Sequence, residues 1–557
     1  MKQLLLFLAF AFPFRSLAQC INFNETFPVN DRVSNQHREY QFQSPGNLNL
    51  EPEKYLIDKD TFFTLGFTKG FWFGGFDPSG NLALTATGYQ DSDLGMGPIY
   101  NSSGLDDIEL CRFFNKEWQI RKIEVESLRA AFSSNSLTVD IIPQDILEWP
   151  ALGNPWIGEF APQYDMAPFY DLNLDGIYNP LDGDYPIALI ENPEFIPYLF
   201  TFSVNNDNVP HSESESTTIT IENHLLSYLV NCEEEQESNH TIFTRLKTIY
   251  KGLYDMKNFK ISLWQDFDLG CIDDDLVGSD PPLNAVFTYN EFGQDNQDCF
   301  FPGTIVPEEG AAVYSSILLN NDIQSFMSYD NGAFTTFIQG IDPSSPLEYY
   351  NYMTAQWRDG TKLTTGGNGY NPNSINTTQF AYPNLPNDPS GWSMQSANIS
   401  FGDRRTVTTL FSQDIQPGEI IVLDMAEHVF YTEEVNDLSV FDSWPAAIQK
   451  LKEEYNKQIN GNYDCQDFMT STSKKLINLS TLKIYPNPSS DFVTIEFDQL
   501  HKGTLFVYNS EMKLIKSELI KGADKIKLAT QDFTQGIYYL TVVNNEGKIA
   551  REKFIKI

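Results

Sequence analysis

Phe62-Phe-Thr-Leu-Gly-Phe-Thr-Lys-Gly-Phe-Trp-Phe-Gly-Gly-Phe76 is the stretch that decides the fold class. Aromatic residues dominate it, and aromatic and β-branched side chains suit the pleated, half-buried surface of a strand. The segment Asp77-Pro-Ser-Gly80 follows, which is typical of a turn, and the strand pattern resumes at 81–87. We therefore predict two strands joined by this turn.

Similar runs occur at 216–222, 241–250, 259–264 and 419–423, and turn residues such as those at 366–369 separate them. One helix is expected at 443–460, because Asp442 or Ser443 can cap it, Pro445 suits its first turn and Gly461 ends it. The apolar residues that share one face of this helix are Ile448, Leu451, Tyr455 and Ile459. The patterns together predict an all-β fold, a β-sandwich body of one or two domains with a single C-terminal helix.

The end of the chain has its own pattern of short strands. It begins with Leu482-Lys-Ile-Tyr-Pro-Asn-Pro488, passes through Gln535-Gly-Ile-Tyr-Tyr-Leu-Thr-Val-Val543 and closes on a basic segment at 548–557. On these residues, 482–557 resembles the type A C-terminal sorting domain of the type IX secretion system of Gram-negative bacteria. The positions that match its motifs are Pro486, Asn487, Pro488, Gly536 and Tyr538, whereas Met512 stands where the family has a turn glycine. The resemblance implies a small β-sandwich, recognition by the type IX secretion machinery, and passage through the periplasm to the cell surface or the medium.

The N-terminal residues indicate the same route. Lys2 precedes an apolar run at 4–14, and small residues precede a predicted signal-peptide cleavage between Ala18 and Gln19. This run is too short for a stable anchor, and no other stretch approaches the ~18 apolar residues of a membrane span, so no transmembrane segment is expected in the mature chain. A lipoprotein signal is the alternative because Cys20 follows, but Gln19 is larger than the residue that such signals place before the cysteine.

The chain is thus expected to comprise a signal peptide at 1–18, an N-terminal β-rich region at 19–188, a second β-rich region at 189–465, a linker at 466–481 and the sorting domain. Of 37 Lys and Arg and 75 Asp and Glu residues, 482–557 holds 11 and 9, which leaves 26 basic and 66 acidic residues, a net charge of −40, in 1–481. An acidic body repels nucleic acid and anionic membrane surfaces, so neither is expected as a partner. Solubility outside the cell and binding of divalent cations both account for such a charge.

The cysteines indicate disulfides rather than zinc. None lies in a Cys-x-x-Cys motif, and an even number in an oxidising compartment favours pairing, with buried free thiols as the alternative. We predict a bond between Cys271 and Cys299, which bracket an acidic segment. The six cysteines are Cys20, Cys111, Cys232, Cys271, Cys299 and Cys465.

The best motif for a ligand is Asp171-Leu-Asn-Leu-Asp-Gly-Ile-Tyr-Asn-Pro-Leu-Asp182. Its oxygens follow the spacing of a calcium loop, with a glycine at the sixth position, where the chain must bend, and a carbonyl ligand at the seventh. The predicted Ca²⁺ ligands are Asp171, Asn173, Asp175, Ile177, Asn179 and Asp182. Because it ends on an aspartate, the loop resembles those of dockerins and thrombospondin type 3 repeats. Pro180 argues against the exit helix of an EF-hand. We therefore predict a lone calcium clip; an Asx-rich surface turn is the alternative.

A second acidic cluster follows the strand predicted at 259–264. Alternation places Asp266 and Asp268 on one face, where they could share a metal ion or act as a carboxylate pair. Solvated turn residues are the alternative for this run of aspartates, which extends to Asp280.

The segments 71–82, 148–154, 167–176, 183–186 and 263–270 are together similar to a group of uncharacterised large secreted proteins that carry the same tail, and this similarity implies no activity. Motifs of serine hydrolases, zinc peptidases and phosphate-binding loops are absent, so no catalytic residue is predicted. His211 is expected to lie in a solvated loop.

We expect a secreted or cell-surface protein with a binding or structural rather than a catalytic role. The alternatives are a module that binds an extracellular glycan or surface polymer, and a glycosidase-like hydrolase with dispersed carboxylates. A groove lined by exposed aromatic rings would favour the first, and a cleft with two suitably spaced carboxyl groups the second. The tryptophans that could form such a groove are Trp72, Trp156, Trp264, Trp357 and Trp392.

Overall fold

The aromatic run at 62–76 forms two strands, β4 (Phe62–Phe63) and β5 (Thr68–Phe76). β5 pairs antiparallel with β6 (Leu82–Thr85). In the turn between them, the Asp77 carboxylate accepts hydrogen bonds from the N–H groups of Ser79 and Asn81, both at 2.8 Å. The predicted pair of strands joined by a turn is confirmed. β5 is buried on both faces, and its aromatic residues therefore do not alternate with polar ones.

The structure is a computed structural model. It describes residues 66, 68–88, 91–99, 107–232, 237–271, 274–291, 293, 310–332, 335–432, 434–463, 483–508, 514–544 and 549–557, with short strands at 41–43, 47–49, 55–56 and 62–63. Two compact units comprise Met1–Cys465 and Gln466–Ile557. The predicted cleavage between Ala18 and Gln19 and the linker at 466–481 lie outside the described residues.

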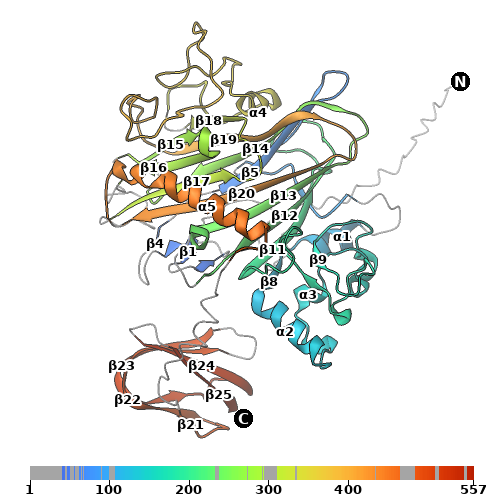
Figure 1. Ribbon diagram of the computed structural model, residues 1–557, viewed down its shortest axis with the longest axis vertical. Helices are drawn as coiled ribbons and strands as arrows, with labels where there is room; N and C mark the ends of the chain where they lie inside the picture. Colours follow the sequence, from blue (N-terminus) through green and yellow to red (C-terminus); the bar gives the residue numbers. More distant parts are fainter. Residues whose placement is uncertain are drawn as a thin grey trace, which may run out of the picture. The chain divides into compact units, whose positions relative to one another are not determined.

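The first unit is built on two antiparallel sheets (Figure 1). The large sheet has the order β15 (Asp275–Asp280), β16 (Ala285–Asn290), β17 (Ala311–Leu318), β20 (Ile420–Thr432), β13 (Thr241–Tyr250), β12 (Ile221–Leu229), β11 (Leu199–Asn206) and β7 (Gly95–Met96), with β8 (Trp118–Arg121) also paired to β11. The small sheet has the order β18 (Ser325–Asp330), β19 (Arg404–Ile415), β14 (Met256–Phe267), β5 and β6. A further sheet joins β4 to β1 (Gln41–Gln43), β2 (Asn47–Asn49) and β3 (Tyr55–Leu56).

The large and small sheets face each other, which confirms the β-sandwich. Ser316 Oγ of the large sheet donates a hydrogen bond to Gln265 Oε1 of the small sheet at 2.9 Å, and Lys69 forms an ion pair with Glu427 across the same gap. Side chains of both sheets also line a cavity of about 90 Å³ between them. One hydrophobic core includes residues of both layers.

Helix α5 (Trp444–Ile459) confirms the predicted C-terminal helix. It crosses the outer face of the large sheet (Figure 1), where Trp444 Nε1–H donates to Ser315 Oγ at 2.9 Å and Tyr455 donates to Asp424 at 2.6 Å. Ile448 and Leu451 are fully buried, as the apolar stripe predicts. Ser443 occupies the N-cap position, although its side chain makes no capping hydrogen bond.

The expectation of a single helix is wrong. Four more α-helices occur in the described part of the chain: α1 (Asp107–Phe114), α2 (Lys122–Ser133), α3 (Gln144–Leu147) and α4 (Pro346–Met353). Three of them lie in 107–198, a largely irregular region that contributes only β8 and two very short strands. This region was expected to be β-rich, and it is not. These helices are short, and α2 buries only Val125 and Leu128, so they carry too little apolar periodicity to be detected.

The expected boundary at 188/189 does not separate compact units. β7 and β8 from the N-terminal part pair with β11, and β5 pairs with β14, so both sheets combine strands from either side of that position. Among the helices that the structure describes, none has both the length and the apolar character needed to cross a membrane.

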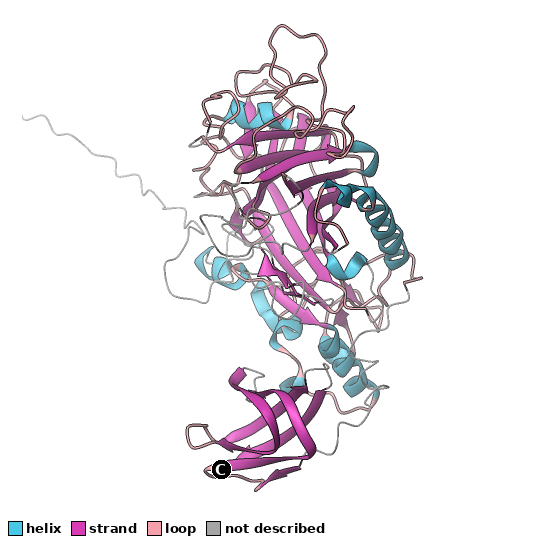
Figure 2. Cartoon of the chain, turned by 90° about the vertical axis from the view of Figure 1, so that its left-hand side faces the viewer, coloured by secondary structure: helices cyan, strands magenta, loops and turns pink. Residues whose placement is uncertain are grey.

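The second unit is a small β domain with its own core, as predicted. Its strands are β21 (Lys483–Tyr485), β22 (Phe492–Tyr508), β23 (Leu514–Ala529), β24 (Gly536–Asn544) and β25 (Ile549–Lys556). β22 and β23 lose register near Glu496, and the curved sheet that results (Figure 2) encloses a sandwich-like core. Val493, Leu505, Tyr538 and Phe554 belong to that core.

Candidate functional site

The predicted calcium loop is held at both ends by a short hairpin. β9 (Phe169–Tyr170) precedes it and β10 (Tyr185–Pro186) follows it, and the two strands pair antiparallel. The rings of Tyr170 and Tyr185 stack with their centroids 4.9 Å apart. The hairpin and the stacked rings therefore hold the two ends of the loop together.

Asp171 organises the first half of the loop. Its Oδ1 accepts a hydrogen bond from the N–H of Leu174 at 2.7 Å, and its Oδ2 accepts one from the N–H of Gly176 at 2.8 Å. Leu174 and Gly176 both have left-handed backbones, with φ of 63° and 78°. This curvature brings the chain around the first predicted ligand, and the glycine supplies it without the strain of a side chain.

The remaining predicted ligands make hydrogen bonds within the loop. Asp175 Oδ1 accepts from the N–H of Ile177 at 2.8 Å, and Asn179 Nδ2–H donates to Asp182 Oδ2 at 2.7 Å. Asn173 exchanges two hydrogen bonds of 3.0 Å with Asp175. The donor set therefore consists of the hard oxygens that Ca²⁺ prefers, and ionised carboxylates accept several partners each.

The three carboxylates of the loop do not converge as closely as expected. Among the described acidic side chains, the one group of three with ligand oxygens all within 4.8 Å of one another lies elsewhere. The Asp171 carboxylate accepts hydrogen bonds from backbone N–H groups, and the Asp182 carboxylate accepts one from the Asn179 amide. These hydrogen bonds keep the carboxylates apart.

Asp184, which lies just beyond the loop template, is a positioning residue that the sequence motif does not include. It is fully buried, and its two oxygens accept hydrogen bonds from the N–H groups of Leu172 and Asn179, each at 2.9 Å. Burial raises the pKa of its carboxyl; the two hydrogen bonds lower it, and the negative charges of Asp171 and Asp175 raise it further. A cation in the loop would relieve this repulsion. The sequence feature that could have pointed to Asp184 is its position between Gly183 and the short strand β10.

We predict that Asp184→Ala lowers the free energy of unfolding by roughly 2–4 kcal/mol, because two buried N–H groups lose their acceptor. Asp182→Ala is the matched control, since Asp182 is exposed and its removal should change stability by less than about 1 kcal/mol in calcium-free protein. Urea unfolding in the presence of chelator measures both. Equal losses for the two variants would contradict the role given to Asp184.

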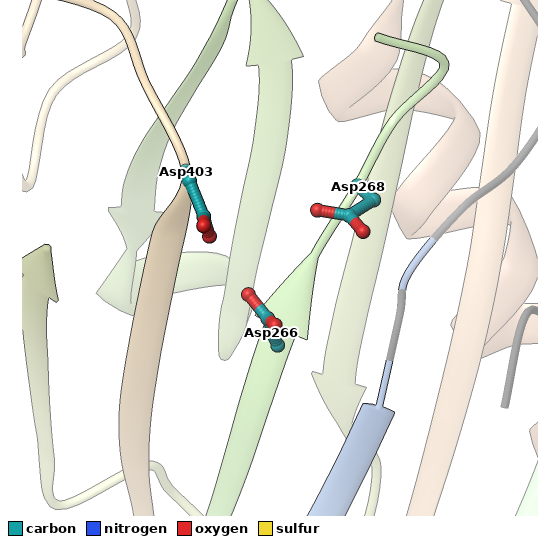
Figure 3. Close-up of side chains that lie close together, drawn as sticks. All are labelled: Asp266, Asp268 and Asp403. Carbon is teal, nitrogen blue, oxygen red and sulfur yellow. The ribbon is translucent and has the colours of Figure 1, made fainter. Parts of the chain in front are cut away.

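The second acidic cluster gains a member from a distant part of the sequence. Asp266 is the second-last residue of strand β14, Asp268 lies just beyond the strand, and Asp403 lies directly before β19; their carboxylates point toward one another (Figure 3). The oxygens of all three lie within 4.8 Å of one another. The antiparallel register, which pairs Asp266 with Arg405, brings the neighbouring segments together. Asp266 and Asp268 share a face as predicted, and both are buried rather than solvated.

An arginine partly neutralises this cluster. Arg405 Nη1 lies 2.5 Å from Asp403 Oδ1, and its Nη2 lies 3.7 Å from Asp266 Oδ2. A guanidinium inside a carboxylate group disfavours a second cation at the same place. The cluster therefore suits a divalent ion less well than the loop at 171–182 does.

A cleft of about 470 Å³ adjoins the cluster and is lined by Asp330, Asp403 and Arg404 among others. Asp330 pairs with Arg404 and Asp403 with Arg405, so both carboxylates that line the cleft are held by an arginine.

The tryptophans do not form an exposed platform. Trp72, Trp264, Trp357 and Trp392 are all at least nine-tenths buried, and Trp156 is 41% exposed. Trp156 lies beside the loop, where its Nε1–H donates to Asn179 Oδ1 at 3.0 Å.

The side chain of His211 is buried, so the expectation that it is solvated is wrong. Its ring nitrogens lie 2.8 Å from the carbonyl oxygen of Leu84 and 3.1 Å from that of Asp207. The buried carboxylates of Asp93 and Asp207 also lie near the ring, at 3.8 and 3.9 Å.

Cys232 and Cys271 each take part in a disulfide bond, so the alternative of free thiols is wrong for these two residues. Cys20, Cys299 and Cys465 lie outside the described residues, and so does the side chain of Cys111. The pairing of Cys271 with Cys299 stays a prediction.

The residues of the sorting motif hold the first and last strands of the second unit together. Asn487 Nδ2–H donates to the carbonyl of Lys553 at 3.1 Å, and Asn487 Oδ1 accepts from the N–H of Ile555 at 2.9 Å. Tyr538 is buried between the rings of Phe533 and Phe554.

Residues 483–557 match the family model of the secretion system C-terminal sorting domain. The chain is therefore exported to the cell surface or the extracellular space, and its tail engages the type IX secretion machinery. No curated protein matches the chain.

The solved structures to which the chain is similar share little with it. One is a polysaccharide lyase, with a TM-score of 0.16 and 8% identity, over 60% of this chain and 34% of the lyase, so the chain spans about a third of that protein. Another contains the CBM51-2 and INT domains of ZmpB from Clostridium perfringens, with a TM-score of 0.10 and 11% identity, over 60% of this chain and 89% of that one.

Proposed function

We propose that the exported body is a binding or structural protein of the cell surface or the medium, and that one Ca²⁺ held by the loop at 171–182 stabilises it. Asp171, Asn173, Asp175, Asn179 and Asp182 would supply side-chain oxygens and Ile177 its carbonyl. The ion would cross-link a segment that has few apolar contacts of its own. The observation that carries the proposal is the closure of the loop around Asp171, with Leu174 and Gly176 both left-handed.

The absence of catalytic geometry at the described cleft supports a binding or structural role over hydrolysis. Its lining carboxylates are ion-paired, and its tryptophan, Trp357, is buried. An extracellular glycan or surface polymer is the class of partner that suits an exported protein. Phe401, which lines the cleft and is 46% exposed, is the aromatic ring on which such a partner would pack.

We predict that chelation lowers the melting temperature of the purified protein and that Ca²⁺ restores it better than Mg²⁺, which resists irregular coordination. At millimolar Ca²⁺, a site with a dissociation constant of about 10 µM would stabilise the folded state by roughly 2.7 kcal/mol through mass action. Asp175→Ala should abolish the response, whereas Asp140→Ala, an exposed aspartate outside the loop, should retain it. Identical melting curves with and without chelator, in protein that starts loaded with calcium, would reject the stabilising role.

A further inference from the structure

A second cavity, of about 270 Å³, lies on the outer face of the large sheet, beside the hairpin of β9 and β10 that carries the loop at 171–182. Its floor comes from three adjacent strands, β11, β12 and β13. The register sets His224 opposite Lys247 and Leu226 opposite both Arg245 and Phe202, so these side chains lie in two neighbouring rows on one face. Segments 165–169 and 187–190 form its walls, which are mainly apolar.

His224 is fixed in the floor by a buried glutamate. Its Nε2 lies 2.8 Å from Glu222 Oε1, and Glu222 also accepts hydrogen bonds from Tyr164 Oη at 2.7 Å and from Lys251 Nζ at 2.6 Å. An ionised carboxylate only accepts, so Nε2 carries the proton.

The other nitrogen of this ring, Nδ1, is buried and has no hydrogen-bond partner among the described residues. Burial lowers the pKa of His224 in spite of the opposing effect of Glu222, which keeps the ring neutral and leaves Nδ1 as an acceptor. A buried acceptor without a donor is costly unless a ligand or a water satisfies it.

Lys247 provides a charge beside this acceptor. Its ammonium group donates to the carbonyl of Asp165 at 2.8 Å and forms no ion pair within the part of the chain that the structure describes. Arg245 is different, because Asp424 and Glu191 both bind its guanidinium. Burial lowers the pKa of Lys247, so a bound anion would offset the desolvation of its charged form.

We propose that this cavity binds a small 2-hydroxycarboxylate with an apolar body. The carboxylate pairs with Lys247, the hydroxyl donates to His224 Nδ1, and the apolar part packs on Phe202, Leu226 and Met166, which line the cavity. The three features occur side by side in one cavity, and they match the three parts of such a molecule. The inference does not rest on the calcium site or on the role proposed above.

Calorimetry of the full chain at neutral pH with phenyllactate tests the site. Two matched probes each lack one group: 3-phenylpropionate lacks the hydroxyl, and 3-phenylpropane-1,2-diol lacks the carboxylate. We expect phenyllactate to bind and each of the other two to bind about tenfold more weakly or worse, because one buried polar group then stays unpaired.

Lys247→Met keeps the apolar stem and removes the charge, so it should weaken phenyllactate binding about tenfold or more. Lys257→Met is the matched control, since Lys257 is half-exposed and pairs with Asp414 away from the cavity; its affinity should be unchanged. Absence of phenyllactate binding, equal affinities for the three probes, or an unaltered affinity in Lys247→Met would overturn the proposal. The comparison of probes on the unmodified protein decides the matter if Lys247→Met fails to fold.

Discussion

Deletion of residues 482–557 is expected to leave a folded protein in the periplasm and none at the cell surface. The two units have separate hydrophobic cores, one drawn from Phe71 to Tyr455 and the other from Val493 to Phe554. The deletion therefore removes the sorting domain without opening the core of the body, since domains with their own cores fold independently. Cell fractionation with surface proteolysis measures the location, and the melting temperature of the purified fragment measures its fold.

The full-length chain, made in the same strain, is the control for this experiment. A fragment that is folded and reaches the surface at normal levels would contradict the assignment of the tail. A fragment that is unfolded in the periplasm would contradict the independence of the two units.

The second large effect concerns Glu222, for which Glu222→Gln is expected to lower the free energy of unfolding by about 3 kcal/mol at neutral pH. Although burial opposes ionisation, the hydrogen bond from His224 and the charge and hydrogen bond of Lys251 lower the pKa of Glu222 from its ordinary 4.5 to about 2. A shift of this size corresponds to roughly 3 kcal/mol of stabilisation of the folded state by the charged form. The glutamine amide would also place its N–H donors against the groups that now donate to Glu222, which are those of Tyr164, His224 and Lys251.

The sign of the pH dependence follows from the depressed pKa. The contribution of Glu222 is fully present above the unfolded-state pKa near 4.5, and it is lost as the pH falls toward the folded-state pKa near 2. The difference in stability between the unmodified protein and Glu222→Gln should therefore shrink between pH 4.5 and pH 2 in urea titrations. Glu126→Gln, at an exposed position of α2, should show no such difference. A constant difference at all pH values would show that the charge of Glu222 does not stabilise the fold.

The parts of the fold that were predictable are those whose pattern is local. The strand at 241–250 and the helix at 443–460 have strong periodicity and clear ends, and both appear as β13 and α5. β12 was placed five residues too early, at 216–222 instead of Ile221–Leu229. α1 to α4 escaped detection because they are short, and an apolar periodicity needs a longer run to stand out.

The candidate site residues likewise divide into those with a local sequence pattern and those that only the tertiary fold brings together. The loop at 171–182 is one continuous segment, so its curvature around Asp171 could be expected from its spacing. Asp403 lies far from Asp266 in the chain, and only the pairing of β14 with β19 brings the two together. Asp184 and His211 are polar residues whose burial depends on tertiary neighbours, and a single sequence carries no local signal for that. His224 and Lys247 become a pair only through the register of β12 and β13.

The calcium content of the mature protein, purified from the medium without chelator, tests the central claim most directly. Elemental analysis should find about one calcium per chain in the unmodified protein and in Asp140→Ala, and none above background in Asp171→Ala and Asp175→Ala, because these remove carboxylates from the loop. A stoichiometric calcium that persists in both loop variants, or an unmodified protein that binds none at millimolar Ca²⁺, would contradict the account.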